Sequence, residues 1–234
     1  MLKTFSPEPY LMGMSLPAGT LVRTGAERAT LVRRTYALVF VSILFTIAGS
    51  MFALSQPRLL QAVAAHPFIA LFATLAPLLL AMRARDVFPA NIGLVLLFTF
   101  VEGVFISPIL YVYGQQQPGL ITQAAMLTIG AFGVLTGYAF ISRRDFSAWG
   151  HFFTVGLFVL IGVMLLNLFF RNPAMDLWLA GITVLVFSGL LVFDTWRIRN
   201  VYGPNEYVAA AVTIYLDMLN LFLALLRILG GRRS

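Results

Sequence analysis

Two aspartates lie in consecutive apolar stretches near the end of the chain, among residues that are typical of membrane-spanning helices. Asp194 lies in SGLLVFDTWRI and Asp217 in TIYLDMLNLFLALLR, with a short basic loop between the two stretches. A carboxylate at the centre of a membrane helix costs roughly 2.5–3.5 kcal/mol on insertion scales, so such residues usually mark an ion, proton or substrate path. Two carboxyl groups a few ångströms apart do not ionise independently and titrate as a unit. We therefore expect Asp194 and Asp217 to face each other and to form a titratable site on an ion path.

A purely structural interpretation of the two aspartates is also open, in which each pairs with an arginine or with backbone groups and only stabilises helix packing. Their depths in the membrane bear on the choice. Asp194 lies about two residues from the inner end of its expected helix, whereas Asp217 lies about ten residues, or about 15 Å, into the next one. The two residues meet only if the first turns of the last helix, near 206–211, lie at the membrane interface. The preceding residues 203–206, GPNE, are typical of a helix start at that level.

Three further polar residues lie in or beside the apolar stretches. Arg83 closes the second stretch on its inner side, where it is either an ordinary anchor or a bidentate partner of the two carboxylates. Glu102 lies about halfway along the third stretch and is either a protonated, hydrogen-bonded acid or part of the ion path. Asn220 is typical of the hydrogen bonds that join membrane helices, and we keep it with Glu102 as a candidate for the ion path. Calcium prefers oxygen ligands, so the aspartate pair is also a candidate calcium site.

The elements that position these residues follow from composition. The chain has 234 residues, of which 60% are hydrophobic and 11% charged, and its mean hydropathy is +0.90. An ordinary soluble domain has about 25% charged residues. The long apolar runs lack the alternation of a membrane barrel, so they must be helices. We expect a tail at residues 1–29 on the cytoplasmic side and one domain of seven membrane helices at residues 30–234. The expected spans are 36–54, 67–82, 91–112, 120–141, 149–170, 177–196 and 207–226.

The basic residues predict the orientation of the chain. A net charge of +7 would suggest nucleic acid binding in a soluble protein, but membrane proteins keep Lys and Arg in cytoplasmic loops, so we expect no nucleic acid partner. With the N-terminus inside, the outer loops hold only Arg58 and Arg171. The arginines after the last span, Arg227, Arg232 and Arg233, would lie outside after seven crossings and inside if the last segment is re-entrant. The side of the C-terminus therefore stays open.

Enzymatic functions fit the sequence poorly. There is no cysteine, which excludes thiolate metal sites and disulfides. No serine lies in a G-x-S-x-G context. An intramembrane aspartyl protease would carry G-x-G-D at its second aspartate, where this chain has Ile214-Tyr215-Leu216-Asp217. We therefore expect a protein that is not an enzyme and that has no cofactor.

The chain resembles bacterial members of the Bax inhibitor-1 family, also called the transmembrane Bax inhibitor motif family. The resemblance covers nearly all of the chain after the N-terminal tail. It rests on TGY at 136–138, SRRDFS at 142–147, FDT at 193–195 with Ile198, and YLDMLNLF at 215–222 running into LLR at 225–227. Glu102 and Gly103 are also similar to the family pattern.

The resemblance implies a bundle of seven helices in which the last helix is surrounded by the other six. It also implies a pH-sensitive calcium leak, closed by a pair of aspartates that Asp194 and Asp217 match. An arginine at the end of helix two latches to that pair, and Arg83 is the matching position, although the nearby Asp86 and Pro89 depart from the pattern. The family also contains regulators of cell death and bacterial proteins that modulate membrane proteases.

Two functions follow from these observations. The first is a passive, pH-gated leak for cations, above all calcium, in the inner membrane of a bacterium, with calcium as the transported ion. The second is a non-conducting interaction protein that binds a membrane protease or acts in a stress or cell-death pathway. Calcium flux into liposomes that contain only the purified protein would separate the two.

Overall fold

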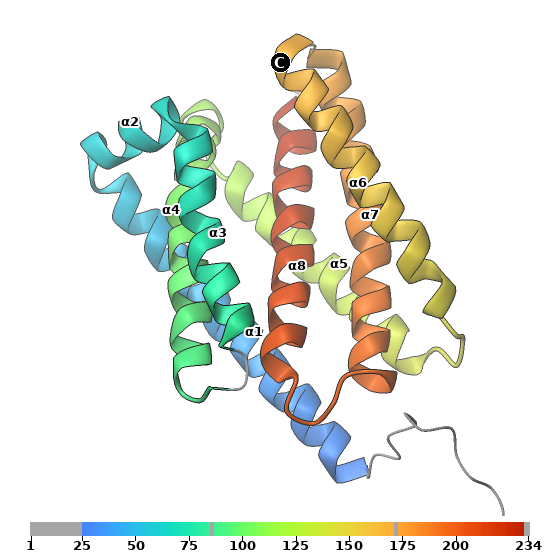
Figure 1. The fold of residues 1–234 in the computed structure, drawn as a ribbon. Helices are drawn as coiled ribbons and strands as arrows, with labels where there is room; N and C mark the ends of the chain where they lie inside the picture. Colours follow the sequence, from blue (N-terminus) through green and yellow to red (C-terminus); the bar gives the residue numbers. More distant parts are fainter. Residues whose placement is uncertain (1–24, 85–86, 171–172, 232–234) are drawn as a thin grey trace, which may run out of the picture.

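The computed structural model describes residues 25–84, 87–170 and 173–231, and these form a bundle of long α-helices (Figure 1). Residues 1–24 of the expected tail lie outside the described residues, whereas residues 25–29 already belong to the first helix. The helices are α1 (Gly25–Leu54), α2 (Pro57–Ala65), α3 (Pro67–Arg83), α4 (Ala90–Gln116), α5 (Leu120–Ile141), α6 (Ser147–Phe170), α7 (Pro173–Asn200) and α8 (Tyr207–Gly231).

By length and composition, six of the described helices can each cross a membrane, and the bent pair of α2 and α3 can supply a seventh span. The all-helical membrane fold expected from the sequence is therefore confirmed. The helix α2 was not expected: it has 9 residues, and it meets the 17-residue α3 at an angle of 99°. Pro57 and Pro67 each lie in the first turn of a helix, a position that proline favours because its missing N–H would have no partner there.

The last helix, α8, lies in the middle of the bundle (Figure 1). It packs against α1, α4, α5 and α7. In its most apolar stretch 56% of the residues are buried, against 44% in α7 and 11% in α6. The prediction that the last helix is the central one is therefore confirmed. A central helix can carry polar side chains because they face other helices instead of lipid.

The helices α1 and α4 approach each other closely through two glycines. A methyl group added at Gly49 would overlap the backbone carbonyl of Phe100, and one added at Gly103 would overlap that of Thr46. Small residues at such positions let two membrane helices pack backbone against backbone. The helices α1 and α4 therefore pack closely against each other beside α8.

The C-terminal end of α7 is tied to the end of α5 by Arg199. Its guanidinium donates to the carbonyl oxygens of Ala139, Phe140 and Ser142 at 3.3, 2.9 and 2.7 Å. The last carbonyls of a helix have no partner inside that helix, so Arg199 caps α5. This contact holds the part of α7 that carries Asp194 against the rest of the bundle.

The close approach of α1 and α4 leads to a first prediction. Gly103→Ala should lower the unfolding temperature in detergent, because overpacking a tight contact costs about 1–3 kcal/mol. Gly133→Ala is the matched control, since nothing lies within 4 Å of a methyl group there. Alanine is the better helix former, so the control should be neutral or slightly stabilising. Equal unfolding temperatures for the two variants would contradict the tight contact.

Candidate functional site

The structure brings Asp194 of α7 and Asp217 of α8 together inside the bundle. Their carboxyl groups lie close enough to share a hydrogen bond, and the two residues are only 6% and 5% exposed. The difference in depth noted above is smaller than expected because α7 continues to Asn200, four residues beyond the expected end at Trp196. Asp194 is then about 9 Å from the end of its helix, whereas Asp217 is about 15 Å into α8.

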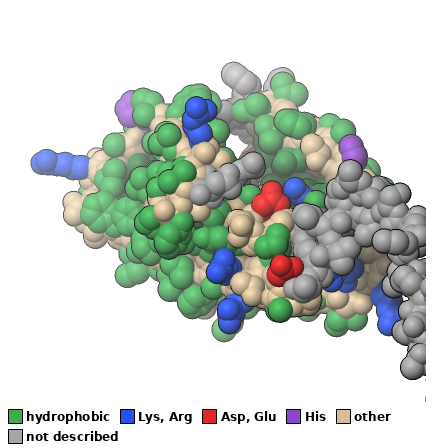
Figure 2. Space-filling model, turned by 60° about the horizontal axis from the view of Figure 1, so that its bottom comes forward, with side chains coloured by type: hydrophobic (Ala, Val, Ile, Leu, Met, Phe, Trp, Pro, Cys, Tyr) green, Lys and Arg blue, Asp and Glu red, His purple; other side chains and the backbone are tan. Residues whose placement is uncertain are grey.

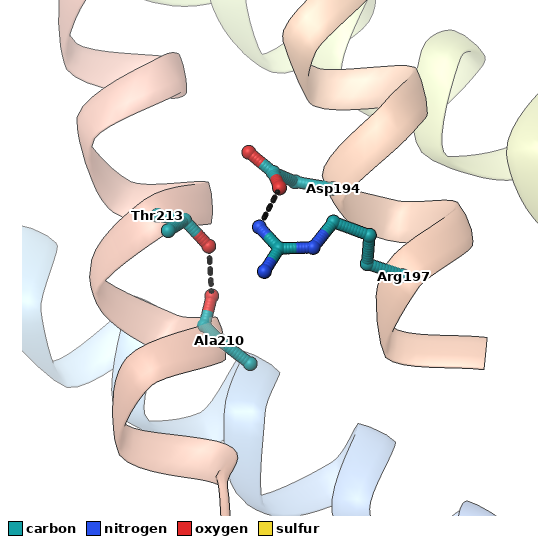
Figure 3. A network of polar contacts seen from close by, with 4 residues as sticks. All are labelled: Asp194, Arg197, Ala210 and Thr213. Carbon is teal, nitrogen blue, oxygen red and sulfur yellow. Dashed lines mark hydrogen bonds and ion pairs between the residues drawn. The ribbon is translucent and has the colours of Figure 1, made fainter. Parts of the chain in front are cut away.

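A guanidinium also belongs to this site, and it comes from Arg197. Its Nη1 donates to Oδ1 of Asp194 at 2.9 Å, one helical turn along α7. Figure 3 shows this ion pair in the space between α7 and α8. The guanidinium also lies over the ring of Tyr202 at 4.6 Å and over that of Phe193 at 5.6 Å, where cation–π attraction holds it.

Charge is not balanced at the carboxyl pair. One guanidinium can neutralise one carboxylate, and Oδ2 of Asp217 is buried with no hydrogen-bond partner among the described residues. An uncompensated charge in such a place costs several kcal/mol. The second carboxyl group must therefore be neutralised by a proton or by a cation. The site therefore has the chemistry of a proton-binding or cation-binding site.

Tyr202 lies beside the guanidinium of Arg197. It lies in the loop between α7 and α8 and is 6% exposed. Burial raises the pKa of the Tyr202 phenol, so the hydroxyl stays protonated at neutral pH. The neutral, buried ring packs against the guanidinium of Arg197 and so helps to hold the ion pair with Asp194.

One face of α8 carries the polar residues nearest to Asp217. Thr213, Asp217 and Asn220 are spaced by four and three residues, which places them on the same face. Thr213 donates to the carbonyl oxygen of Ala210 at 3.0 Å (Figure 3), and Asn220 donates to that of Leu216 at 2.8 Å. The Thr213 hydroxyl and one N–H of the Asn220 amide thus donate within α8 itself.

Glu102 does not join the carboxyl pair. It lies beside Thr74 of α3 and Tyr215 of α8. The Tyr215 hydroxyl is 2.7 Å from Oγ1 of Thr46, which in turn donates to the carbonyl oxygen of Ser42 at 3.0 Å. Tyr215 and Asp217 are two residues apart, or about 200° around the helix, so this second polar cluster lies on the opposite side of α8.

Among the described residues, Arg83 is not part of the ion pair at Asp194. It ends α3 and its side chain is exposed. Within the described ranges, the ion pair to Asp194 comes from Arg197 and none comes from Arg83. A latch by Arg83 in a closed conformation stays a prediction. Arg85, the next basic residue along the chain, lies outside the described residues.

Sequence reasoning missed Arg197, Tyr202 and the contact of Tyr215 with Thr46. Arg197 was assigned to the inner loop because the expected helix ended at Trp196. Its spacing of three residues from Asp194 is the signal that could have found it, since residues three apart on a helix are neighbours. No sequence signal pairs Tyr215 with Thr46, because the packing of α8 against α1 decides that contact.

The described residues offer no larger metal cage. Within residues 25–84, 87–170 and 173–231, no three His, Cys, Asp or Glu side chains come together as a group that could hold a metal ion. Calcium usually takes six to eight oxygen ligands. The aspartate pair can therefore supply only part of the shell of a passing cation.

Comparison with known proteins identifies the family of the chain. The family model described as "Inhibitor of apoptosis-promoting Bax1" matches residues 28–234. The chain belongs to the Bax inhibitor-1 family. It is 32% identical over 208 residues to Bax inhibitor 1 of Schizosaccharomyces pombe, covering 87% of this chain and 77% of that protein. It is also 32% identical over 205 residues to protein lifeguard 4 of Mus musculus, covering 86% of this chain and 85% of that one.

Bacterial relatives are similar to the same extent. An uncharacterised membrane protein of Vibrio cholerae is 32% identical over 209 residues, covering 87% of this chain and 90% of that protein. The family model's match at residues 28–234 includes α7 and α8. The protein is therefore a multi-pass membrane protein of this family.

The ion pair between Arg197 and Asp194 leads to a second prediction. Arg197→Gln leaves the buried carboxylate of Asp194 without its charged partner, so stability should fall. The side chain of Arg197 is 32% exposed, and solvent screens part of the interaction, so we expect a loss of about 1–2 kcal/mol. Adding Asp194→Asn should restore part of this loss, because the two residues act as a pair. Unfolding in detergent measures all three variants.

Arg143→Gln is the control for this cycle, because Arg143 is an exposed arginine in the loop between α5 and α6. It should unfold near the wild-type temperature. If Arg143→Gln and Arg197→Gln cost the same, the loss reflects net charge and not the contact with Asp194.

Proposed function

We propose that the protein is a pH-sensitive leak for cations, above all calcium, in the inner membrane of a bacterium. The observation that carries the proposal is the pair of carboxyl groups buried between α7 and α8 with a single guanidinium beside them. Such a pair binds either a proton or a cation, and intramembrane carboxylates of this kind usually serve transport.

The gate is formed by the two helices that carry the carboxyl groups. While α7 and α8 are in contact, Asp194 and Asp217 are held together and the path between the helices is filled. Separation of the helices exposes oxygen ligands that suit a hard cation such as calcium. The two conformations hold different numbers of protons at the pair, so flux depends on pH.

Glu102 and Asn220 are proposed as further contacts on the ion path. Asn220 lies one turn beyond Asp217 on the same face of α8. Glu102 lies on the opposite side of this helix, beside Tyr215. A path that uses both residues would pass around α8, so Glu102 has the lesser part in this proposal.

A second function, that of a non-conducting interaction protein, is supported by the names of relatives. A protein of vaccinia virus that is 31% identical over 205 residues is called "Golgi anti-apoptotic protein"; the match covers 86% of this chain and 85% of that protein. For this chain, the corresponding role would be the regulation of a membrane protease or of a stress or cell-death pathway. This role requires no flux through the purified protein at any pH.

The leak leads to a third prediction, tested by calcium flux into liposomes between about pH 5 and 8. Asp194→Asn and Asp217→Asn should each flatten the curve of flux against pH, because either change removes the shared titration. The double variant should add little, since the two residues act as a unit. Flux by the wild type that is absent at every pH would favour the interaction protein.

Asp145→Asn is the matched control for these variants. Asp145 is an exposed acid whose carboxylate accepts from the backbone N–H of Ser147 at 2.8 Å, at the start of α6. Asparagine caps helices as well as aspartate does, so the fold should be unchanged. The control should keep the wild-type pH profile. A wild-type profile in the two single gate variants would instead leave the pair with a structural role and make Glu102 the next candidate for the sensor.

The arginines lead to a fourth prediction. Arg197→Gln should raise the leak at neutral pH, because it removes the cation that contacts Asp194 in the described conformation. Arg83→Ala should raise it as well if Arg83 latches the pair in a closed conformation. Arg143→Ala serves as control for the loss of one positive charge. An unchanged leak from folded Arg83→Ala protein would leave Arg83 as a topology anchor only.

A further inference from the structure

A cavity lies outside the carboxyl pair, at the end of the bundle where the loop between α7 and α8 is found. Its volume is about 740 Å³, which is within the usual range of ligand sites. It is formed where α4 and α8 begin and α1 passes between them. Its lining includes Arg34, Ala37, Val41, Phe88, Asn205 and Tyr207.

The cavity is polar toward the end of the bundle and apolar further in. Arg34, Asn205 and Tyr207 supply hydrogen-bond donors from a guanidinium, an amide and a phenol. Val41 lies seven residues, or about 10 Å, further along α1 than Arg34. Figure 2, which brings this end of the molecule forward, shows hydrophobic side chains with scattered arginine and acidic side chains among them. A ligand that fits this cavity is therefore amphipathic, with its polar group toward the end of the bundle and its apolar part further in.

The positive charge of Arg34 is available to such a ligand. Its guanidinium lies 5.7 Å from the ring centre of Tyr207, and within the described part of the chain no carboxylate forms an ion pair with it. The nearest acid in the sequence to Tyr207 is Glu206, whose carboxylate accepts from the backbone N–H of Gly203. A phosphate group would fit this place, because guanidinium and phosphate form strong, charge-assisted hydrogen bonds.

The apolar side of the cavity continues along the outer face of α1. Leu44 and Phe45 follow Val41 by three and four residues, and they are 48% and 38% exposed. This face belongs to a helix that is long and apolar enough to cross a membrane, so it faces acyl chains. A lipid with its headgroup at Arg34 would therefore have its chains along Val41, Leu44 and Phe45.

We propose that this cavity binds an anionic glycerophospholipid, with the phosphate on Arg34 and the acyl chains along α1. A basic pocket between helices at a membrane surface is the usual form of such a site. A free phosphate would use Arg34 but not the apolar surface beyond it. The proposal goes beyond the leak and does not depend on it, because no residue of the carboxyl pair lines the cavity.

The test is lipid binding to the purified full-length protein, measured by native mass spectrometry. Phosphatidylglycerol and phosphatidylcholine with the same acyl chains are compared, and soluble glycerol phosphate is added as a competitor. The wild type should retain phosphatidylglycerol in preference to phosphatidylcholine. Arg34→Gln should lower this retention about five-fold, the effect of one basic residue near an anionic lipid.

Arg33→Gln is the matched control, because Arg33 is the exposed neighbour of Arg34 on α1 and does not line the cavity. It should retain phosphatidylglycerol like the wild type. Val41→Trp fills the apolar part and should also lower retention, so the test does not rest on one variant. Equal losses for Arg33→Gln and Arg34→Gln, equal retention of the two lipids, or displacement by glycerol phosphate at the concentration of the lipid would each overturn the proposal.

Discussion

Two carboxyl groups share a buried space with one guanidinium, and this mismatch of charge is the constraint on which the account of the protein depends. Arg197 neutralises Asp194, but Asp217 is buried on the central helix with one oxygen that has no hydrogen-bond partner among the described residues. A buried charge without a partner is costly enough to drive either a change of protonation or a change of conformation. This imbalance is the basis for proposing that the site binds protons or cations, since a fully paired site would only stabilise the fold.

Contacts among the remaining helices hold α7 and α8 in the positions that bring the two carboxyl groups together. The close contact of α1 and α4 through Gly49 and Gly103 gives α8 a firm wall on one side. On that side, Tyr215 is held by its hydroxyl contact with Thr46. On the other side, Arg199 fixes the end of α7 to the end of α5. Tyr215 and Asp217 lie about 200° apart around α8, so the helix that holds Tyr215 against α1 places Asp217 on its other side, beside Asp194 of α7.

The sequence predicted the helices and the carboxyl pair because both leave strong local signals. Long apolar runs mark the spans, and an aspartate inside such a run is conspicuous. The helix α2 was not predicted, because a nine-residue stretch between two prolines resembles a loop. Arg197 was not predicted as a site residue because the end of α7 was placed four residues too early, and helix ends are the least certain part of a sequence-based prediction. The contact of Tyr215 with Thr46 joins residues that are 169 positions apart, and packing alone determines it.

The central claim is that Asp194 and Asp217 titrate as one unit inside the protein. Infrared difference spectroscopy of the purified protein in lipid measures this directly, through the carbonyl stretch of protonated carboxyl groups as the pH is changed. The experiment is done in a Glu102→Gln background, so that the other acid inside the bundle does not contribute. We predict a band that changes with pH and that is lost in Asp194→Asn and in Asp217→Asn alike. A band that persists unchanged when both aspartates are replaced would contradict the account.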